Sequence, residues 1–432
     1  MKARMIFAMF GLLSMNAIAR SHPQSIDDAL KQAQAEHLPV FADFQAQWCY
    51  SCYFMATHVL TGAEWDAMEK RMVVVEVDAD SPDGARWMKK LDVKALPMFV
   101  VLKPDGSELG RVVAEQPRDK FYAQMQKILS GGDAIDALKK NVDAGSMTAV
   151  ADVLAGYQAR GQFQQGLDWY ASLTAARRAS AEKDARVSLW RERLVMEIAA
   201  NAEDHAACVA SGEKVLASAI GCDRYYVLES LLDCSEKLPE AERKTLLTKQ
   251  RPAMTTLLDK QVFVQPAQCA DQRTAVLVTA DLDKAIGDSS AETAVLVRGI
   301  EDAKRRLAGD VGKDRNLADN LRVFLDRAGR IDELDALMPK LMAAYPDDYV
   351  YSYRYGASLL KRNRPADALP YLERAAEKTF GANRLSVASL RVKALLALNR
   401  RADAEKVVAD ALEANGPWFP EQAAKLKALL QS

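Results

Sequence analysis

Short apolar runs alternate with amphipathic segments over residues 26–129, and this alternation predicts strands and helices in turn. The runs at 38–44, 72–77 and 98–102 are rich in β-branched or aromatic residues and have the length of buried strands. The turn signal Lys103-Pro104-Asp105-Gly106 separates the third run from a fourth at 109–113, which predicts an antiparallel hairpin. Helical segments are expected at 26–36, 50–71 and 118–129. This order predicts a mixed sheet covered by helices.

The remainder of the chain has a helical pattern that partly repeats. Small, large and turn positions recur in two clear copies: Gly356, Leu359, Asn363, Ala368, Leu372 and Ala375, then Leu395, Asn399, Ala404, Val408 and Ala411. The step from Ala368 to Ala404 is 36 residues, close to the repeat of tetratricopeptide helix pairs. Two weaker copies are Gly329, Leu334, Met338, Leu341 and Pro346, and Gly161, Phe163, Gly166, Tyr170 and Leu173. We therefore expect an all-α, tetratricopeptide-like solenoid in which small residues let paired helices approach closely.

The first 19 residues have the layout of an export signal. Lys2 and Arg4 precede the apolar run 5–13, and Ala17-Ile18-Ala19 offers small residues for cleavage. The alternative is an uncleaved anchor, but the run is short of the ~20 residues that span a bilayer. We expect a mature protein that does not span the membrane and is periplasmic or secreted.

These patterns divide the chain into three parts. Residues 1–19 form the signal peptide, 20–132 an α/β domain, and 133–432 a helical repeat domain whose clearest repeats lie at about 316–416. The boundary is placed at Ser130-Gly131-Gly132, where the helical pattern stops. The segment 180–315 is helical without an alignable repeat, and a helix at 417–430 is expected to cap the array.

Composition narrows the functional classes. Lys and Arg number 58 against 59 Asp and Glu, so no basic excess favours nucleic-acid binding. Six cysteines in 432 residues are too few for a small disulfide-stapled scaffold. The function must therefore come from local motifs.

The motif Trp48-Cys49-Tyr50-Ser51-Cys52 follows the first predicted strand and opens the next helix. A cysteine at a helix N-terminus meets the positive end of the helix dipole, which stabilises its thiolate. Cys52 lies one turn further on and can close a disulfide with Cys49. We therefore expect Cys49 to be the nucleophile and Cys52 to resolve the mixed disulfide.

Three further positions make residues 25–130 resemble the thioredoxin superfamily, in particular the C-terminal thioredoxin-like domain of periplasmic thiol-disulfide interchange proteins. Asp43 lies on the strand six residues before Cys49, where the family has a buried acid that moves protons for the second cysteine. Pro97, after Leu96, precedes the hairpin as the family's cis-proline does, and Trp48 matches the family's tryptophan. The resemblance implies that Leu96, Pro97 and Trp48 contact the substrate.

Two departures and two alternatives accompany this resemblance. Tyr50-Ser51 replaces the Gly-Pro of thioredoxin, and residues 113–115 lack the glycine that thioredoxins have beside the substrate groove. The cysteine pair could instead be half of a zinc site, although zinc needs four ligands, or a purely structural disulfide. Electron exchange also requires a pair that is open to solvent and faces the loop bearing Leu96.

The other four cysteines lie in the helical region. Cys208, Cys222, Cys234 and Cys269 allow three pairings, which the sequence cannot separate. The alternative is that they are free and pack as small apolar residues. We expect at least one disulfide among them, because the chain is expected in an oxidising compartment.

Together these observations predict an exported thiol-disulfide oxidoreductase whose helical domain recognises clients or partners. Its partners would be proteins or peptides with disulfides or thiols, and the resemblance leaves room for an upstream membrane electron donor. No metal or organic cofactor is expected, since the dithiol carries the electrons. The alternative is a redox-sensing scaffold in which the repeats bind partners and the thioredoxin-like domain is a docking module.

Overall fold

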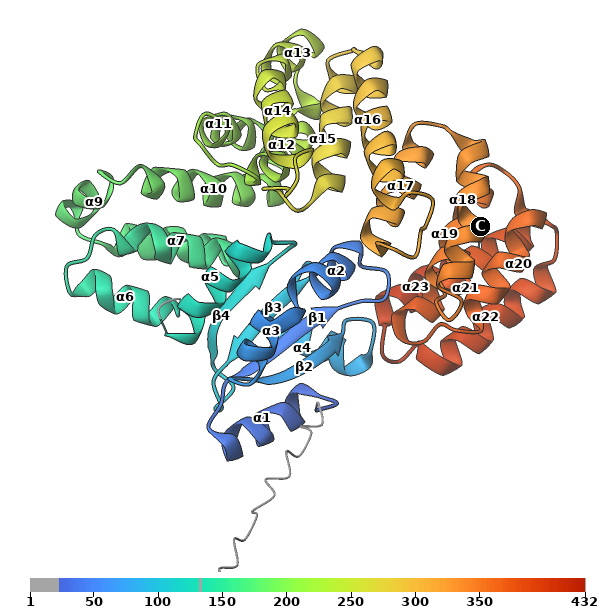
Figure 1. Cartoon of the computed structure of the whole chain (residues 1–432), viewed down its shortest axis with the longest axis horizontal. Helices are drawn as coiled ribbons and strands as arrows, with labels where there is room; N and C mark the ends of the chain where they lie inside the picture. The colour runs from blue at the N-terminus through green and yellow to red at the C-terminus, as the bar shows by residue number, and fades with distance from the viewer. Residues whose placement is uncertain (1–22, 132–133, 432) are drawn as a thin grey trace, which may run out of the picture.

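The computed structural model describes residues 23–131 and 134–431. The predicted export signal at 1–19 and Gly132 of the predicted boundary therefore lie outside the described residues. A domain built on a β-sheet comes first, and a long array of helices follows it (Figure 1). The last helix of the sheet domain ends at Leu129 and the first helix of the array begins at Ile135, while the precise domain limits stay a prediction.

The sheet has four strands in the order β2-β1-β3-β4. Strand β1 (Val40–Gln45) runs parallel to β2 (Val73–Asp78) and antiparallel to β3 (Met98–Leu102), which forms a hairpin with β4 (Glu108–Val113). In this register Asp43 lies between Glu76 of β2 and Phe99 of β3. The mixed sheet and its hairpin confirm the expected topology.

Helices cover both faces of this sheet because its strands are apolar on both sides. Val40, Ala42 and Phe44 face one cluster with α1 (Ile26–Glu36) and α4 (Pro82–Lys90). Phe41 faces the other cluster, which includes residues of α3 (Gly62–Glu69) and α5 (Arg118–Leu129). The helix that follows β1 is α2 (Tyr50–Phe54), which continues as one π-helical turn, η1 (Met55–Val59).

Two features of the sheet domain differ from the predicted elements. The single helix expected at 50–71 is interrupted after η1, because Thr61 is extended and Gly62 has φ +78°, a left-handed conformation that favours glycine. Helix α4 was not predicted from the sequence; Ser81 caps it through its side chain, and Pro82 is its first residue. Its nine residues bury Trp87 against the sheet.

The array is all-helical. Its α-helices are α6 (Ile135–Asp143), α7 (Ala149–Ala159), α8 (Phe163–Ser172), α9 (Ala175–Ala181), α10 (Ala185–Asn201), α11 (His205–Leu216), α12 (Asp223–Cys234), α13 (Glu240–Thr248), α14 (Arg251–Leu257), α15 (Gln272–Ala285), α16 (Ser289–Leu307), α17 (Arg315–Arg327), α18 (Ile331–Ala344), α19 (Val350–Lys361), α20 (Pro365–Ala376), α21 (Gly381–Ala397), α22 (Arg401–Asn415) and α23 (Pro420–Ala428). The last of these packs on α21 and α22, as the predicted capping helix should.

The turn positions of the predicted repeats join consecutive helices that pack together. Gly161, Gly329, Asn363 and Asn399 all have φ between +57° and +67°, and they separate α7 from α8, α17 from α18, α19 from α20 and α21 from α22. At Gly356 of α19, a Cβ atom would lie 2.6 Å from the Leu372 side chain of α20. Close approach at a small residue thus confirms the expected tetratricopeptide-like helix pairs.

The four cysteines of the array form two disulfides. Cys208 of α11 bonds to Cys234 of α12, and Cys222 at the start of α12 bonds to Cys269 just before α15. These bonds select one of the three pairings that the sequence allowed, and both link neighbouring parts of the array.

The array curves around the sheet domain and contacts it at both ends. In Figure 1, α6 and α7 lie on the left, on the side of β4, and α17 to α23 lie on the right, on the side of α2. At the first end, Arg160 forms an ion pair with Glu108 of β4 at 2.8 Å. At the other end, Asn383 of α21 donates to Asp80 in the loop after β2 at 2.7 Å. Within residues 23–131 and 134–431, no helix combines the length and apolar character needed to cross a bilayer.

Candidate active site

The Cys49–Cys52 pair lies at the N-terminus of α2, as the sequence predicts. Cys49 is the N-cap residue, and its Sγ accepts a hydrogen bond from the Cys52 backbone N–H at 3.1 Å. The two sulfurs are joined in a disulfide with a Cα–Cα distance of 5.2 Å. When the bond is reduced, the helix dipole and this N–H favour the Cys49 thiolate.

The disulfide faces the loop before β3. Leu96 packs against the small apolar cluster of Ala46, Cys49 and Cys52, and the Leu96–Pro97 peptide bond is cis. The Pro97 carbonyl accepts from the backbone N–H of Ala114 at 3.0 Å. Ala114 has φ +62°, so alanine adopts the left-handed conformation in the segment where we could not find the family's glycine.

Asp43 lies on β1, and its carboxyl oxygen Oδ1 is buried without a hydrogen-bond partner. Burial, with a smaller contribution from neighbouring Glu76, raises the pKa of Asp43 to about 8. This position favours the predicted buried acid over an ordinary surface carboxylate. A group with such a pKa can exchange a proton with a thiol near neutral pH.

Trp48 is partly exposed, and both its indole N–H and its backbone carbonyl are hydrogen-bonded. Its side chain is 41% exposed, yet the indole Nε1–H donates to Asp80 Oδ2 at 2.8 Å. The Trp48 carbonyl accepts from Arg354 Nη2 of α19 at 2.7 Å. The predicted substrate-contacting tryptophan therefore also belongs to the contact between the sheet domain and the array.

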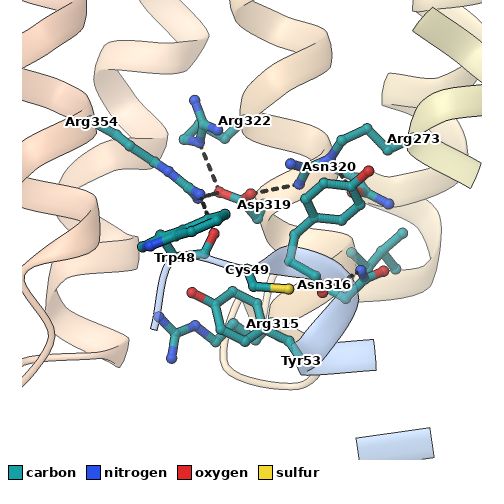
Figure 2. Close-up of polar contacts among 12 residues, drawn as sticks. Trp48, Cys49, Tyr53, Arg273, Arg315, Asn316, Asp319, Asn320, Arg322 and Arg354 are labelled. Carbon is teal, nitrogen blue, oxygen red and sulfur yellow. Dashed lines mark hydrogen bonds and ion pairs between the residues drawn. The ribbon is translucent and has the colours of Figure 1, made fainter. Parts of the chain in front are cut away.

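The disulfide is covered, which the sequence did not predict. Cys49 is 4% and Cys52 is 5% exposed, so the expectation of a pair open to solvent is wrong for this conformation. Figure 2 shows Arg354, Arg273 and Asn316 of the array gathered over the turn that carries Trp48 and Cys49. The Asn316 side chain of α17 donates to the Tyr50 carbonyl at 2.9 Å.

Two tyrosines of α2 bind arginines of the array. The Arg273 guanidinium of α15 lies 3.5 Å from the Tyr50 ring centroid, and the Tyr50 hydroxyl lies 3.3 Å from Thr274 Oγ1. Arg315 of α17 lies 3.9 Å from the Tyr53 ring centroid. This role was not predicted from the sequence. The bulky Tyr50 between the cysteines, where thioredoxin has a glycine, was the available signal.

A buried carboxylate orders three arginines, two of which contact the turn. Asp319 of α17 is 0% exposed and forms ion pairs with Arg273, Arg322 and Arg354 (Figure 2). Burial alone would raise the pKa of Asp319, but the three guanidinium groups hold it well below its usual range. The cluster fixes Arg273 over Tyr50 and Arg354 beside the Trp48 carbonyl.

Glu115, just after β4, is a second buried acid near the turn that the sequence did not reveal. It is 6% exposed, and neither carboxyl oxygen has a well-formed hydrogen bond. Burial and the nearby Asp271 raise the pKa of Glu115 well above its usual range, although the Ser51 hydroxyl and Arg273 act in the opposite direction.

A metal site was not expected from the sequence, and the described residues offer no group of three or more His, Cys, Asp and Glu placed to hold an ion. His58 of η1 instead pairs with Asp314 at the N-terminus of α17, with 3.3 Å between Nε2 and Oδ2. This ion pair is a further polar contact between the active-site helix and the array.

Comparison with known proteins places residues 26–129 in the thioredoxin-like domain family. The chain is 29% identical over 112 residues to the thiol:disulfide interchange protein DsbD of Ralstonia nicotianae, which is 25% of this chain and 18% of that protein. It is 36% identical over 78 residues to Thioredoxin 1 of Chlorobaculum tepidum, covering 18% of this chain and 72% of that protein. The chain thus matches less than a fifth of the interchange protein's length.

The array has a separate likeness among solved structures. A tetratricopeptide repeat protein from Parabacteroides merdae aligns with 57% of this chain and 99% of its own, with 14% identity and a TM-score of 0.26.

Proposed function

This chain belongs to the thioredoxin family through its N-terminal domain, and from that premise we propose that it is a thiol-disulfide oxidoreductase acting through Cys49 and Cys52. The observation that carries the proposal is the disulfide at the N-terminus of α2, packed against Leu96 beside the cis Pro97. The pair, the loop and the buried Asp43 come from three separate segments that the fold brings into one domain.

The reaction is a two-electron exchange between this dithiol and a client disulfide. The Cys49 thiolate attacks one client sulfur, so that a mixed disulfide forms and the other client sulfur leaves as a thiolate. The Cys52 thiolate then attacks Cys49 Sγ, which restores the Cys49–Cys52 disulfide and releases the second client thiolate. The client gains the two electrons that the dithiol loses. The reverse sequence oxidises a client dithiol.

Asp43 would take the proton of Cys52 during resolution. Cys52 is almost fully buried and must lose its proton before it attacks, because the thiolate is the nucleophile. With its pKa raised to about 8, the Asp43 carboxyl is close to the ordinary thiol pKa of about 8.5, which suits proton transfer between them.

Reduction of insulin by the full chain tests the assignment. Cys49→Ser should abolish turnover, because it removes the attacking sulfur. Replacing Cys222 and Cys269 together by serine is the matched control, since it removes a disulfide outside the proposed site and should leave turnover. Unchanged turnover in Cys49→Ser would remove the nucleophile assignment.

The setting of this activity is also a proposal. We place the mature protein in the periplasm or outside the cell, where disulfides persist, and the pairing of all six cysteines supports this location. The clients would be proteins or peptides with thiols or disulfides, held by the helical array. An upstream membrane electron donor would set the direction of electron flow.

The burial of the disulfide favours a second candidate, a redox-sensing scaffold. In that case the array binds partners and the thioredoxin-like domain holds it in shape. Such a protein should still bind its partners after Cys49 and Cys52 are both replaced by alanine, whereas an exchanger should lose covalent capture of clients. Pull-down with and without reducing agent separates the two functions.

A further inference from the structure

The contact between the active-site turn and the array is polar rather than a shared apolar core. Among the described residues, the buried apolar clusters of the sheet domain contain only sheet-domain residues, and Ala85 of α4 packs against the large cluster of the array. The turn itself is held by hydrogen bonds, ion pairs and arginine–ring contacts. Such an interface can separate without exposing either core.

The polar contacts of the array are made with the residues on either side of Cys49, where a client would have to approach. Asn316 binds the Tyr50 carbonyl, Arg354 binds the Trp48 carbonyl, and Arg273 lies over the Tyr50 ring. These three partners lie on α17, α19 and α15, so three successive layers of the array converge on one turn. A folded client cannot reach Cys49 while they are in place.

The packing beside this turn is incomplete. A cleft of about 890 Å³ lies beside the turn, lined by Phe54 and His58 on one side and by array residues that include Gln268 and Arg306. The array therefore bridges the active-site helix at discrete points and does not seal against it. At its other end the array is tied to β4 through the ion pair of Arg160 with Glu108.

From these observations we propose that the helical array is a lid over the Cys49–Cys52 pair, closed in this structure, and that a protein client reaches Cys49 only after the contacts of Asn316, Arg354 and Arg273 with the active-site turn are released. This proposal rests on the proposed function in that the covered group is the reactive one. The closed form admits small reagents, whereas the open form admits a protein.

Size-dependent alkylation of the reduced full chain tests the lid without requiring turnover. Cys49 is labelled either with iodoacetamide or with a maleimide carried on a small folded protein, and mass spectrometry of the Cys49 peptide gives each rate. The ratio of the two rates in urea, where the chain is unfolded, is the reference. In the native chain the ratio of the bulky-reagent rate to the iodoacetamide rate should be about a hundredfold lower than the same ratio in urea.

The double variant Asn316→Ala/Asn383→Ala weakens closure without orphaning a buried charge. Asn316 binds a backbone carbonyl, and Asp80 keeps its bond from Trp48 when Asn383 is removed. The variant should label about tenfold faster with the bulky reagent and nearly unchanged with iodoacetamide. Arg401→Ala, which removes an exposed pair on α22, is the control and should keep the native ratio.

Two results of the alkylation experiment would overturn the lid. One is a native ratio equal to that in urea, and the other is a folded double variant, checked by circular dichroism, that keeps the native ratio. A second measurement does not depend on the variant and applies if the variant fails to fold. Hydrogen exchange of the α2 amides in the native chain should be faster than exchange through global unfolding. Exchange at the global rate also contradicts the lid. Either failure leaves the insulin assay free to support or reject the proposed chemistry.

Discussion

At the scale of single residues, the proposed proton acceptor Asp43 lowers the stability of the folded chain when its carboxyl ionises. The residue is half-buried on β1, paired in register with Glu76, and the burial of its carboxyl oxygen Oδ1 raises its pKa to about 8. In the unfolded chain an aspartate titrates near pH 4. Below about pH 4 the carboxyl is protonated in both the folded and the unfolded chain, so its burial costs no stability through ionisation; this cost grows as the pH rises above 4 and is complete once the pH has passed about 8.

Replacing Asp43 by asparagine should remove this cost. We expect the free energy of unfolding at pH 7 to increase by roughly 1–3 kcal/mol, less than the full pKa shift implies, because the amide is also buried. The same variant should slow resolution of the mixed disulfide by about a hundredfold, since the proton acceptor is lost. Urea unfolding and rapid-quench kinetics measure the two effects. The exposed Asp66→Asn is the control, and a less stable Asp43→Asn would contradict the assignment.

Much of the site could be predicted at this scale, because its residues are set by local chemistry. The pair Cys49 and Cys52, the acid at Asp43 and the cis bond at Pro97 occupy the predicted positions. The role of Tyr50 could not be predicted. Its partner Arg273 is 223 positions away along the chain, and no local pattern indicates which distant side chain a ring will meet.

At the scale of elements, the hydrophobic pattern predicted the four strands and most of the helices of the sheet domain, and it failed where one position changed the geometry. The predicted helix 26–36 and the predicted strand 98–102 agree with α1 and β3. The helix at 50–71 was broken by Gly62, which also begins α3. In the repeats, the positive φ of Asn363 and Asn399 explains why those turn positions recur.

The α19–α20 pair offers a direct test of the repeat packing. A Cβ atom at Gly356 would lie 2.6 Å from Leu372, so Gly356→Ala should lower the free energy of unfolding by about 1–3 kcal/mol through overpacking. Lys361→Ala on the exposed end of the same helix should change it little. Thermal and urea unfolding provide the comparison. A stabilised Gly356→Ala would show that the two helices are not in close contact.

The disulfides of the array are a second prediction at this scale. Non-reducing peptide mapping should find Cys208 linked to Cys234 and Cys222 linked to Cys269. Replacing Cys208 and Cys234 together by alanine should cost about 3 kcal/mol of stability, because the bond closes a loop of intermediate length in the unfolded chain. A peptide linking Cys208 to Cys222 would contradict the fold of this region.

At the scale of the whole molecule, the placement of the array over α2 is what the sequence could not give. The contacts that hold it are made by single residues on α15, α17, α19 and α21, and each lies more than 200 positions from its partner. Helical periodicity reports which face of a helix is apolar, but it carries no information on which domain a polar residue will contact.

Closure should depend on pH, because the closed form holds Glu115 buried and pairs His58 with Asp314, and the pKa of each group is raised. Glu115 is surrounded by Ser51 of α2, by Asp271 and Arg273 at the start of α15, by Asp314 next to α17, and by Tyr225 and Tyr226 of α12. The hydrogen bond to Asp314 raises the pKa of His58, while partial burial and, to a smaller extent, Arg306 act in the opposite direction. Both groups favour closure when protonated, so their contributions are complete below about pH 4.5 and 6.5 respectively and are lost as the pH rises through the closed-state values.

The rate ratio of bulky to small alkylation at Cys49 should therefore rise as the pH increases above about 4.5, since a ratio cancels the change in thiolate fraction. Glu115→Gln should flatten this rise, because glutamine stays neutral throughout. The exposed Glu64→Gln is the control. A ratio that falls with pH, or a Glu115→Gln profile identical to that of the native chain, would contradict the coupling.

The most direct test of the central claim is capture of a mixed disulfide on Cys49. Full-length chain with Cys52→Ala is reduced and mixed with a short disulfide-bonded peptide, which is small enough to enter without a protein-sized opening. We predict one adduct carrying one arm of the peptide on Cys49, released by dithiothreitol and absent when Cys49 is also replaced by alanine. If Cys49 forms no adduct with this peptide, including after the lid contacts are weakened by Asn316→Ala/Asn383→Ala, the chain is not a thiol-disulfide exchanger.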